Sequence, residues 1–230
     1  MARFSLLLSD VDNTLFDFRS AERAAYATVS ARFALPDEED VFKLYKAVNT
    51  FHWKKLSRGE TTAARLRHDR FADFAAAMGL PDADVPEMSA LFVRTLELEH
   101  TPVEGAEEFL SRVSARMPVC LVTNGFASVQ RSRMKLSPLR RYIADVLVSE
   151  EFAHAKPDPE MLFAAMERMK ISDPARVAMI GDNENTDILA AKNAGVQSIL
   201  FTNGGPAPAE TAATYTAATL ADAADWLLKD

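Results

Sequence analysis

The chain has 230 residues, of which 48% are apolar, and a formal net charge of −7 at pH 7. This length and apolar content suffice for one large domain, or for a core with a smaller domain added to it. The acidic balance argues against a protein that coats a nucleic-acid polymer or lies on a membrane surface, since both favour excess Lys and Arg. The apolar stretch at residues 4–8 is too short for a signal-peptide core, so we expect a cytoplasmic protein.

Short, nearly continuous apolar runs recur along the chain, as expected for strands buried on both faces of a parallel sheet. They span residues 4–10, 118–123, 145–148, 176–182 and 198–202. Segments with helical periodicity separate them, and this alternation predicts an α/β fold with a doubly wound parallel sheet. The single cysteine, Cys120, lies in the second run, where we expect a buried thiol. Residues 207–224 predict a loop and a C-terminal helix that ends near Leu228.

About a hundred residues separate the first two runs, far more than one crossover connection needs. Apolar side chains at helical spacing fill this interval. They form stripes through Val41, Leu44, Tyr45 and Val48, then Phe71, Phe74, Ala75 and Met78, then Met88, Leu91 and Phe92. Asp84 followed by Glu87 is typical of a capped helix start. We therefore predict a helical cap domain at residues 15–100, inserted into a Rossmann-like core of residues 1–14 and 101–230.

Four polar segments follow predicted strands, where a parallel sheet places its active site. The first contains Asp10, Asp12 and Thr14, a spacing that also fits the start of a calcium loop. Leu15 and Ala21 exclude that loop, because they occupy the positions that need glycine and a bidentate glutamate. The other three segments are Val122-Thr123-Asn124-Gly125, His154-Ala155-Lys156-Pro157, and the acidic stretch from Gly181 to Asp187. Taken one at a time, these are a common turn, a solvated lysine and an acidic loop.

Together, the order and spacing of the four segments resemble the haloacid dehalogenase-like superfamily of phosphohydrolases, over nearly the whole chain. The resemblance implies a Mg²⁺-dependent phosphomonoester hydrolase that acts on a small phosphorylated metabolite through an aspartyl-phosphate. Asp10 would be the nucleophile, and Asp12 the general acid and base. Thr14 would stabilise the turn that follows them.

The resemblance also assigns the remaining polar residues. Thr123, together with the backbone amides of Asn124 and Gly125, would bind phosphate oxygens. Lys156 would neutralise charge on the nucleophile and on the transferring group, which makes Thr123 and Lys156 catalytic. The metal ligands would be Asp10, Asp12 through its carbonyl, and Asp182, while Asp187 would orient Lys156 or a metal-bound water. Lys156 compensates only one of the four carboxylate charges, so a phosphate dianion needs a divalent ion, and an all-oxygen site suits Mg²⁺.

The cap decides between members of the superfamily. Asp12 argues against the dehalogenases, because they lack a second aspartate, whereas a phosphomutase keeps both. A narrower resemblance is to the pyrimidine 5'-nucleotidases, and it rests on residues 16–18, Asn49, Trp53, residues 59–62 and residues 67–71. In such an enzyme Phe16, Phe18, Asn49 and Trp53 would contact the nucleobase; the alternative is that Trp53 and Phe71 pack the cap.

The hypothesis we favour is therefore that the substrate is a nucleoside 5'-monophosphate. A sugar-phosphate or phosphoglycolate phosphatase, a phosphomutase, and a catalytically silent binding protein stay open as alternatives. We expect a monomer or homodimer that has neither a nucleic-acid polymer nor a membrane as partner.

Overall fold

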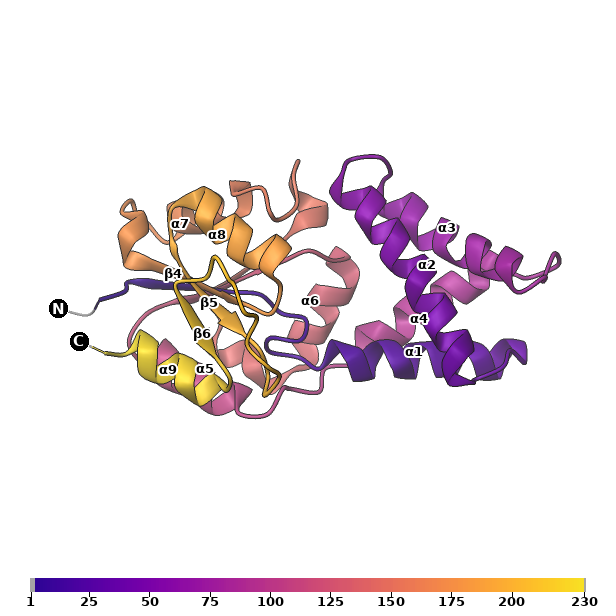
Figure 1. Cartoon of the computed structure of the whole chain (residues 1–230), viewed down its shortest axis with the longest axis horizontal. Helices are drawn as coiled ribbons and strands as arrows, with labels where there is room; N and C mark the ends of the chain where they lie inside the picture. Colours follow the sequence, from indigo (N-terminus) through magenta and orange to yellow (C-terminus); the bar gives the residue numbers. More distant parts are fainter. Residues whose placement is uncertain (1–2, 230) are drawn as a thin grey trace. The chain divides into compact units, whose positions relative to one another are not determined.

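The structure is a computed structural model that describes residues 3–229. Its internal contacts divide the chain into two compact units. The core unit contains residues 3–18 and 100–229, and the helical unit contains residues 19–99 (Figure 1).

A six-stranded, wholly parallel sheet forms the centre of the core unit. Its strands are β1 (Leu6–Ser9), β2 (Val119–Thr123), β3 (Asp145–Val148), β4 (Val177–Gly181), β5 (Gln197–Phe201) and β6 (Tyr215–Ala217). The strand order is β3-β2-β1-β4-β5-β6, so β1 lies in the interior, between β2 and β4. This arrangement confirms the predicted doubly wound α/β fold. The Asp10 amide extends the ladder by donating to the Ile180 carbonyl at 2.9 Å, which places Asp10 beside the end of β4.

Helices cover both faces of this sheet (Figure 1). On one face lie α5 (Ala106–Ser114), α6 (Ala127–Leu136) and α9 (Leu220–Leu227); on the other lie α7 (Glu160–Arg168) and α8 (Leu189–Ala194). Successive side chains of a strand point to opposite faces, and β1 follows this rule: Leu7 belongs to the first apolar core, and Leu6 and Leu8 to the second. Because both faces are covered, β1 and β2 are buried at every position, Cys120 included.

Short helical turns complete the connections of the core unit. Three are 3₁₀-helices, namely η1 (Pro138–Tyr142), η2 (Ser149–Glu151) and η3 (Pro174–Arg176). The fourth, η4 (Glu184–Ile188), is a π-helical turn between β4 and α8. Such turns are frequent at functional sites, and this one lies in the acidic segment that the sequence analysis selected.

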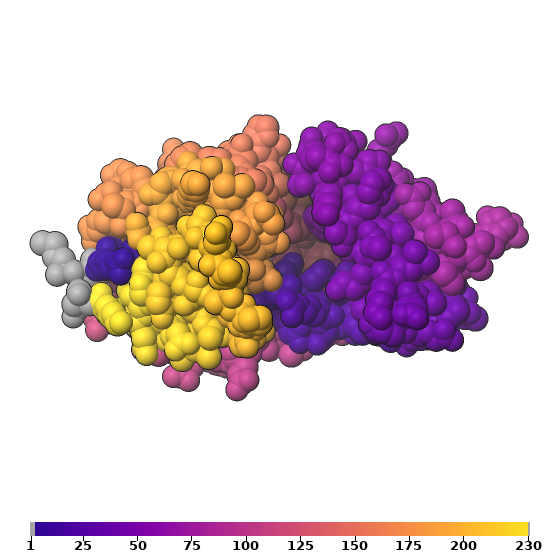
Figure 2. Space-filling view, in the orientation of Figure 1, coloured from indigo at the N-terminus to yellow at the C-terminus, as the bar shows by residue number. Residues whose placement is uncertain are grey.

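Strand β6 was not predicted from the sequence. This strand has three residues at the edge of the sheet, and only Ala217 is fully buried, so no apolar run marks it. The preceding segment, residues 203–212, is largely exposed, and the gold and yellow C-terminal part of the chain lies on the surface shown in Figure 2. The predicted C-terminal helix is present as α9, which begins at a capping box made by Thr219 and Asp222.

The helical unit contains α2 (Glu39–Ser57), α3 (Ala63–Ala77), α4 (Val85–Leu98) and most of α1 (Phe18–Phe33). Tyr45 lies in the middle of its core, with ring centroids 5.4–6.3 Å from those of five other aromatic rings: Tyr26, Phe42, Phe71, Phe74 and Phe92. As predicted, the Asp84 side chain caps α4 by accepting from the Glu87 amide.

The predicted buried stripe of α2 was partly wrong. Val41, Leu44 and Val48 are only half-buried, because the larger Phe42 takes the interior position beside Tyr45. Among residues 3–229, no helix combines the length and the apolar character that crossing a membrane requires.

Candidate active site

Lys156 joins three segments of the core unit through its ammonium group. Its Nζ donates to Asp10 Oδ1 at 2.7 Å, to Asp187 Oδ1 at 2.6 Å and to the Val122 carbonyl at 2.6 Å. Asp10 follows β1, Val122 lies in β2 and Asp187 lies in η4, so the lysine fixes residues that are far apart in the sequence. Its side chain is 1% exposed, and its three N–H groups are all used. The structure thus brings together three of the residues that sequence analysis selected.

Burial and charge act together on this group. Burial raises the pKa of Asp10 well above its usual value; the ammonium of Lys156 opposes this rise, and the negative charges of Asp187, Asp182 and Asp12 add to it. For Lys156, burial alone would lower the pKa, but the attraction of Asp10 and Asp187 outweighs burial and raises it. The lysine therefore stays protonated, and Asp10 lies where added positive charge favours its ionised form.

Asp10, Asp182 and Asp187 form an acidic cluster whose carboxylate oxygens lie within 4.8 Å of one another. Three carboxylates at this distance make an all-oxygen donor set of the kind that Mg²⁺ prefers, and a six-coordinate ion held by three ligands keeps positions for water or a substrate oxygen. The chemistry of the donor set therefore fits a hard divalent cation.

Gly181 at the end of β4 leaves space for this cluster. A Cβ at this position would overlap the Asp187 carboxylate. Asp187 in turn accepts from the Asn183 amide at 3.1 Å through its second oxygen, which fixes the carboxylate from both sides.

Asp12 is held by two side chains of α6 that the sequence analysis did not select. Arg133 Nη1 forms an ion pair with Asp12 Oδ1, and Gln130 Nε2 donates to Asp12 Oδ2 at 2.8 Å. Both oxygens of the Asp12 carboxylate accept hydrogen bonds from α6, and the acidic cluster of the described residues consists of Asp10, Asp182 and Asp187. Arg133 also adds a positive charge that the sequence-based charge count lacked. Its one signal in the sequence was its place in the helix after the Thr123 turn.

The segment after β2 contributes an unpartnered hydroxyl and an amide clamp. Thr123 is 1% exposed, and its Oγ1 makes no hydrogen bond within residues 3–229. A buried hydroxyl in that state is costly unless a ligand supplies the partner. The Asn124 side chain donates to the Lys156 carbonyl at 2.8 Å and accepts from the Lys156 amide at 2.9 Å. The amide side chain of Asn124 thus positions Lys156, a role that the sequence analysis did not foresee.

The turn after β1 places Thr14 beside Asp10. Asn13 adopts a left-handed conformation with φ 60°, which asparagine tolerates better than most residues. Thr14 is fully buried, and its hydroxyl lies 3.5 Å from Asp10 Oδ2, a long contact.

Two of the four residues expected to contact a nucleobase are buried. Phe16 is fully buried in the core of the core unit, with the Arg133 guanidinium 4.9 Å from its ring centroid. Asn49 is buried in the helical unit, where it donates to Glu22 at 2.8 Å and accepts from Arg70 at 3.2 Å. Packing surrounds the first side chain, and internal hydrogen bonds use the amide group of the second. Phe18 and Trp53 are half-buried.

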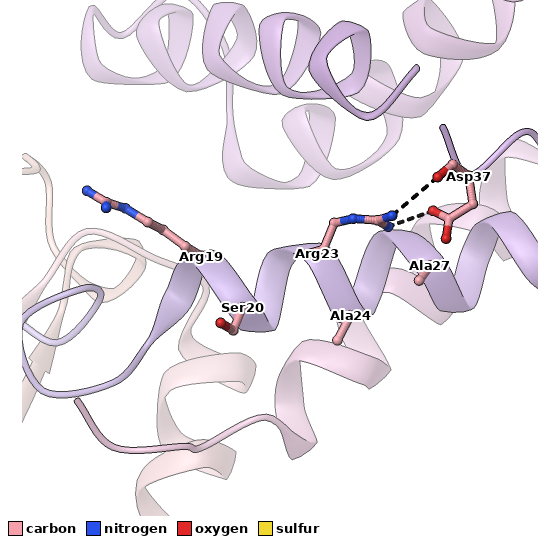
Figure 3. A pocket seen from close by; sticks show the side chains of 6 residues that line it. All are labelled: Arg19, Ser20, Arg23, Ala24, Ala27 and Asp37. Atoms are coloured by element: carbon pink, nitrogen blue, oxygen red, sulfur yellow. Dashed lines mark hydrogen bonds and ion pairs between the residues drawn. The ribbon is translucent and has the colours of Figure 1, made fainter. Parts of the chain in front are cut away.

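A separate hollow of about 560 Å³ lies on α1 of the helical unit (Figure 3). Arg23 donates there to the Asp37 carboxylate at 2.6 Å and to its carbonyl at 3.3 Å. Figure 3 shows Arg19 pointing away from Arg23, so the two guanidinium groups do not converge on one anion. The hollow therefore lacks the chemistry that the core unit concentrates around Lys156.

Comparison with known proteins gives relatives that match most or nearly all of the chain. The chain is 29% identical to the pyrimidine 5'-nucleotidase YjjG of Escherichia coli, over 99% of both chains. It is 26% identical to the pyrimidine 5'-nucleotidase PynA of Streptococcus pneumoniae, over 86% of this chain and 84% of PynA. The solved structure of the HAD-hydrolase YfnB from Bacillus subtilis, bound to magnesium, matches with a TM-score of 0.87 at 28% identity, over 98% of this chain and 99% of YfnB. The family model for haloacid dehalogenase-like hydrolases matches residues 4–195. The chain belongs to the haloacid dehalogenase-like hydrolase family.

Proposed function

We propose that the chain is a Mg²⁺-dependent phosphatase that hydrolyses nucleoside 5'-monophosphates through an aspartyl-phosphate on Asp10. The observation that carries this proposal is the contact of Lys156 Nζ with both Asp10 and Asp187. It holds the nucleophile at the end of a central strand, beside an acidic cluster and an unpartnered Thr123 hydroxyl. Nucleophile, cation, metal ligands and an anion contact are the parts that phosphoryl transfer requires.

The proposed reaction has two steps. In the first, an Asp10 oxygen attacks phosphorus, the bond from phosphorus to the leaving oxygen breaks, and Asp12 gives that oxygen a proton. In the second, water attacks the aspartyl-phosphate, its proton passes to Asp12, and the bonding electrons return to the Asp10 carboxylate. Thr123 and the amides of Asn124 and Gly125 bind the phosphoryl oxygens, and Lys156 offsets their charge.

The metal would be held by Asp10, Asp182 and the carbonyl of Asp12, with Asp187 beside them. When bound, Mg²⁺ would neutralise charge between the nucleophile and the phosphoryl group. Asp187 would keep Lys156 in place throughout, because its other oxygen is fixed by the Asn183 amide.

The choice of substrate is drawn from the relatives. YjjG and PynA, which match most of this chain, are both pyrimidine 5'-nucleotidases. We assign the helical unit, residues 19–99, the role of a cap that selects the leaving group, with Trp53 as a candidate for contact with the base. Phe18, which lies in the core unit, is a second candidate.

Substitution of the nucleophile tests the chemistry. Asp10→Asn should lower Mg²⁺-dependent hydrolysis of p-nitrophenyl phosphate by about a thousandfold or more, because the amide cannot form the aspartyl-phosphate. Circular dichroism should show the fold unchanged. Asp40→Asn, at an aspartate whose side chain is 92% exposed, is the matched control and should keep full activity. Near wild-type turnover by Asp10→Asn would refute the mechanism.

A substrate screen tests the leaving group. Nucleoside monophosphates, sugar phosphates and phosphoglycolate are compared by kcat/KM in the presence of Mg²⁺. A preference for pyrimidine nucleoside monophosphates is expected. A preference for hexose phosphates would remove the nucleotidase assignment and leave the phosphatase intact, while no hydrolysis with several divalent ions would favour a binding protein.

A further inference from the structure

Both carboxylate oxygens of Asp12 accept hydrogen bonds from side chains of α6, and the two donor residues lie one helical turn apart. Arg133 binds Oδ1 and Gln130 donates to Oδ2 at 2.8 Å. The donors are more buried than the group they hold: Gln130 is 3% exposed and Arg133 0%, against 21% for the Asp12 side chain. The Asp12 carboxylate is therefore partly exposed to solvent while buried donors hold it in place, and a group that contacts a substrate needs such exposure.

Two further features fix the donors themselves. The Arg133 guanidinium lies 4.9 Å from the ring centroid of Phe16 and 5.8 Å from that of Phe18, so aromatic faces restrict its position. Gly125 leaves the path of Gln130 open, because a Cβ there would lie 2.8 Å from Gln130 Nε2. The turn after β2 and the helix that follows it thus act as one unit in holding Asp12.

We propose that Gln130 and Arg133 are positioning residues that aim Asp12 at the leaving oxygen and then at the attacking water. The proposal rests on the proposed function, in which Asp12 donates a proton as the bond to the leaving oxygen breaks and takes one back from water. A carboxylate oxygen has two acceptor positions, and each donor uses one, so a free position for the proton remains on each oxygen. Proton transfer depends on the direction of the carboxylate, and two buried donors define that direction.

A purely structural role would make a different prediction. If Asp12 served only to satisfy the buried charge of Arg133, loss of either donor would affect folding and all substrates alike. If the donors aim Asp12, the effect depends on the leaving group. p-Nitrophenolate leaves without a proton, whereas the alkoxide of a nucleoside or sugar needs one.

The test compares Gln130→Leu and Arg133→Met with the wild-type protein in Mg²⁺. The substrates are p-nitrophenyl phosphate and the alkyl phosphate that ranks first in the substrate screen. Gln130→Leu removes a donor and keeps a buried side chain of similar size, and Arg133→Met removes the charge. The matched control is Arg131→Met in the same helix, whose side chain is half exposed and bound to Glu151 on the surface.

For both variants, kcat/KM for the alkyl phosphate should fall about tenfold to a hundredfold more than kcat/KM for p-nitrophenyl phosphate, a fraction of the full effect of general acid catalysis. In both variants, hydrolysis of the aspartyl-phosphate should become slow, because it needs Asp12 to take a proton from water. With p-nitrophenyl phosphate, a burst of nitrophenol equal to the enzyme concentration should therefore precede a slower steady state. Arg133→Lys, which keeps a charged donor, should restore part of the loss, and Arg131→Met should change neither ratio nor burst.

Equal losses on both substrates, or no loss, in variants that unfold at the wild-type temperature would overturn the positioning role. If Arg133→Met fails to fold, Gln130→Leu decides alone. A wild-type chain that hydrolyses neither substrate would instead overturn the proposed function, which separates the two failures.

Discussion

At the residue scale, the core unit contains groups whose arrangement suits a ligand better than it suits the fold. The Thr123 hydroxyl is buried and makes no hydrogen bond within the described residues, although the nearby polar side chains of half-buried Asn124 and buried Gln130 have partners. An unsatisfied buried hydroxyl costs about 1–3 kcal/mol. A position that gives up this much stability is expected where the partner arrives with the substrate.

Thr123→Val should therefore separate stability from activity. Removal of the unsatisfied hydroxyl should raise the free energy of unfolding by about 1 kcal/mol, while kcat/KM for phosphate esters should fall about tenfold or more. Urea unfolding and steady-state kinetics measure the two effects.

The matched control is Thr214→Val, because the Thr214 hydroxyl oxygen already accepts from the Ser198 amide at 3.1 Å. This variant should lose stability and keep its activity. A Thr123→Val protein that is both less stable and fully active would contradict the assignment.

At the element scale, the end of β4 packs closely against the carboxylate of Asp187 in η4. Gly181 is followed at once by Asp182, and the side chain of Asp187 occupies the space that a Cβ on Gly181 would need. This close approach, and no unusual backbone angle, explains the glycine.

Gly181→Ala should move Asp187 away from Lys156 and weaken the acidic cluster. We expect the affinity for Mg²⁺ and kcat/KM to fall by about tenfold or more, with most of the sheet unchanged. Calorimetric titration with Mg²⁺ measures the first effect. The control is Gly205→Ala in the exposed connection between β5 and β6, where a Cβ would lie 3.0 Å from the Thr202 carbonyl oxygen and would meet no residue of the acidic cluster; it should leave both quantities unchanged. Wild-type Mg²⁺ affinity in Gly181→Ala would show that Asp187 is not needed in its observed place.

The elements themselves differed in how far the sequence predicted them. Buried strands such as β1 and β4 were predictable, because burial on both faces leaves an unbroken apolar run. β6 was not, since three residues at an edge carry no such run. In α2, periodicity predicted a helix but selected Val41 and Val48 for the interior, because packing among aromatic rings, and not hydropathy alone, decides which face is buried.

The residues of the candidate site also divide into those that the sequence predicts and those that it does not. Asp10, Lys156 and Asp187 were predictable because parallel strands bring their carboxyl ends to one edge. Gln130 and Arg133 lie 118 and 121 positions from Asp12 in the sequence, and only the packing of α6 against the turn after β1 brings them to it. Contacts of that kind depend on tertiary geometry, which leaves no local pattern in the chain.

At the scale of the whole molecule, metal binding should stabilise the folded state, because the acidic cluster exists only when β1, β4 and η4 are assembled. The melting temperature should rise with Mg²⁺ concentration, with a gain of about 2.7 kcal/mol when the free ion is at about 100 times its Kd. Chelation should abolish hydrolysis. Differential scanning calorimetry over a series of Mg²⁺ concentrations measures the rise in melting temperature. In Asp182→Asn, the melting temperature should change little with Mg²⁺. An equal shift in Asp182→Asn would place the ion elsewhere.

The position of β1 in the sheet has a consequence for the synthesis of the protein. This strand leaves the ribosome before both of its neighbours, which are β2, beginning at Val119, and β4, ending at Gly181. In a nascent chain that stops before β4, one edge of β1 has no partner strand. Chaperones and proteases can reach the unpaired backbone groups of that edge. Such a chain also lacks Asp182 and Asp187. The strand that pairs the second edge of β1 and two aspartates of the acidic cluster would thus be synthesised one after the other, so we expect a product truncated before β4 to be inactive and readily degraded.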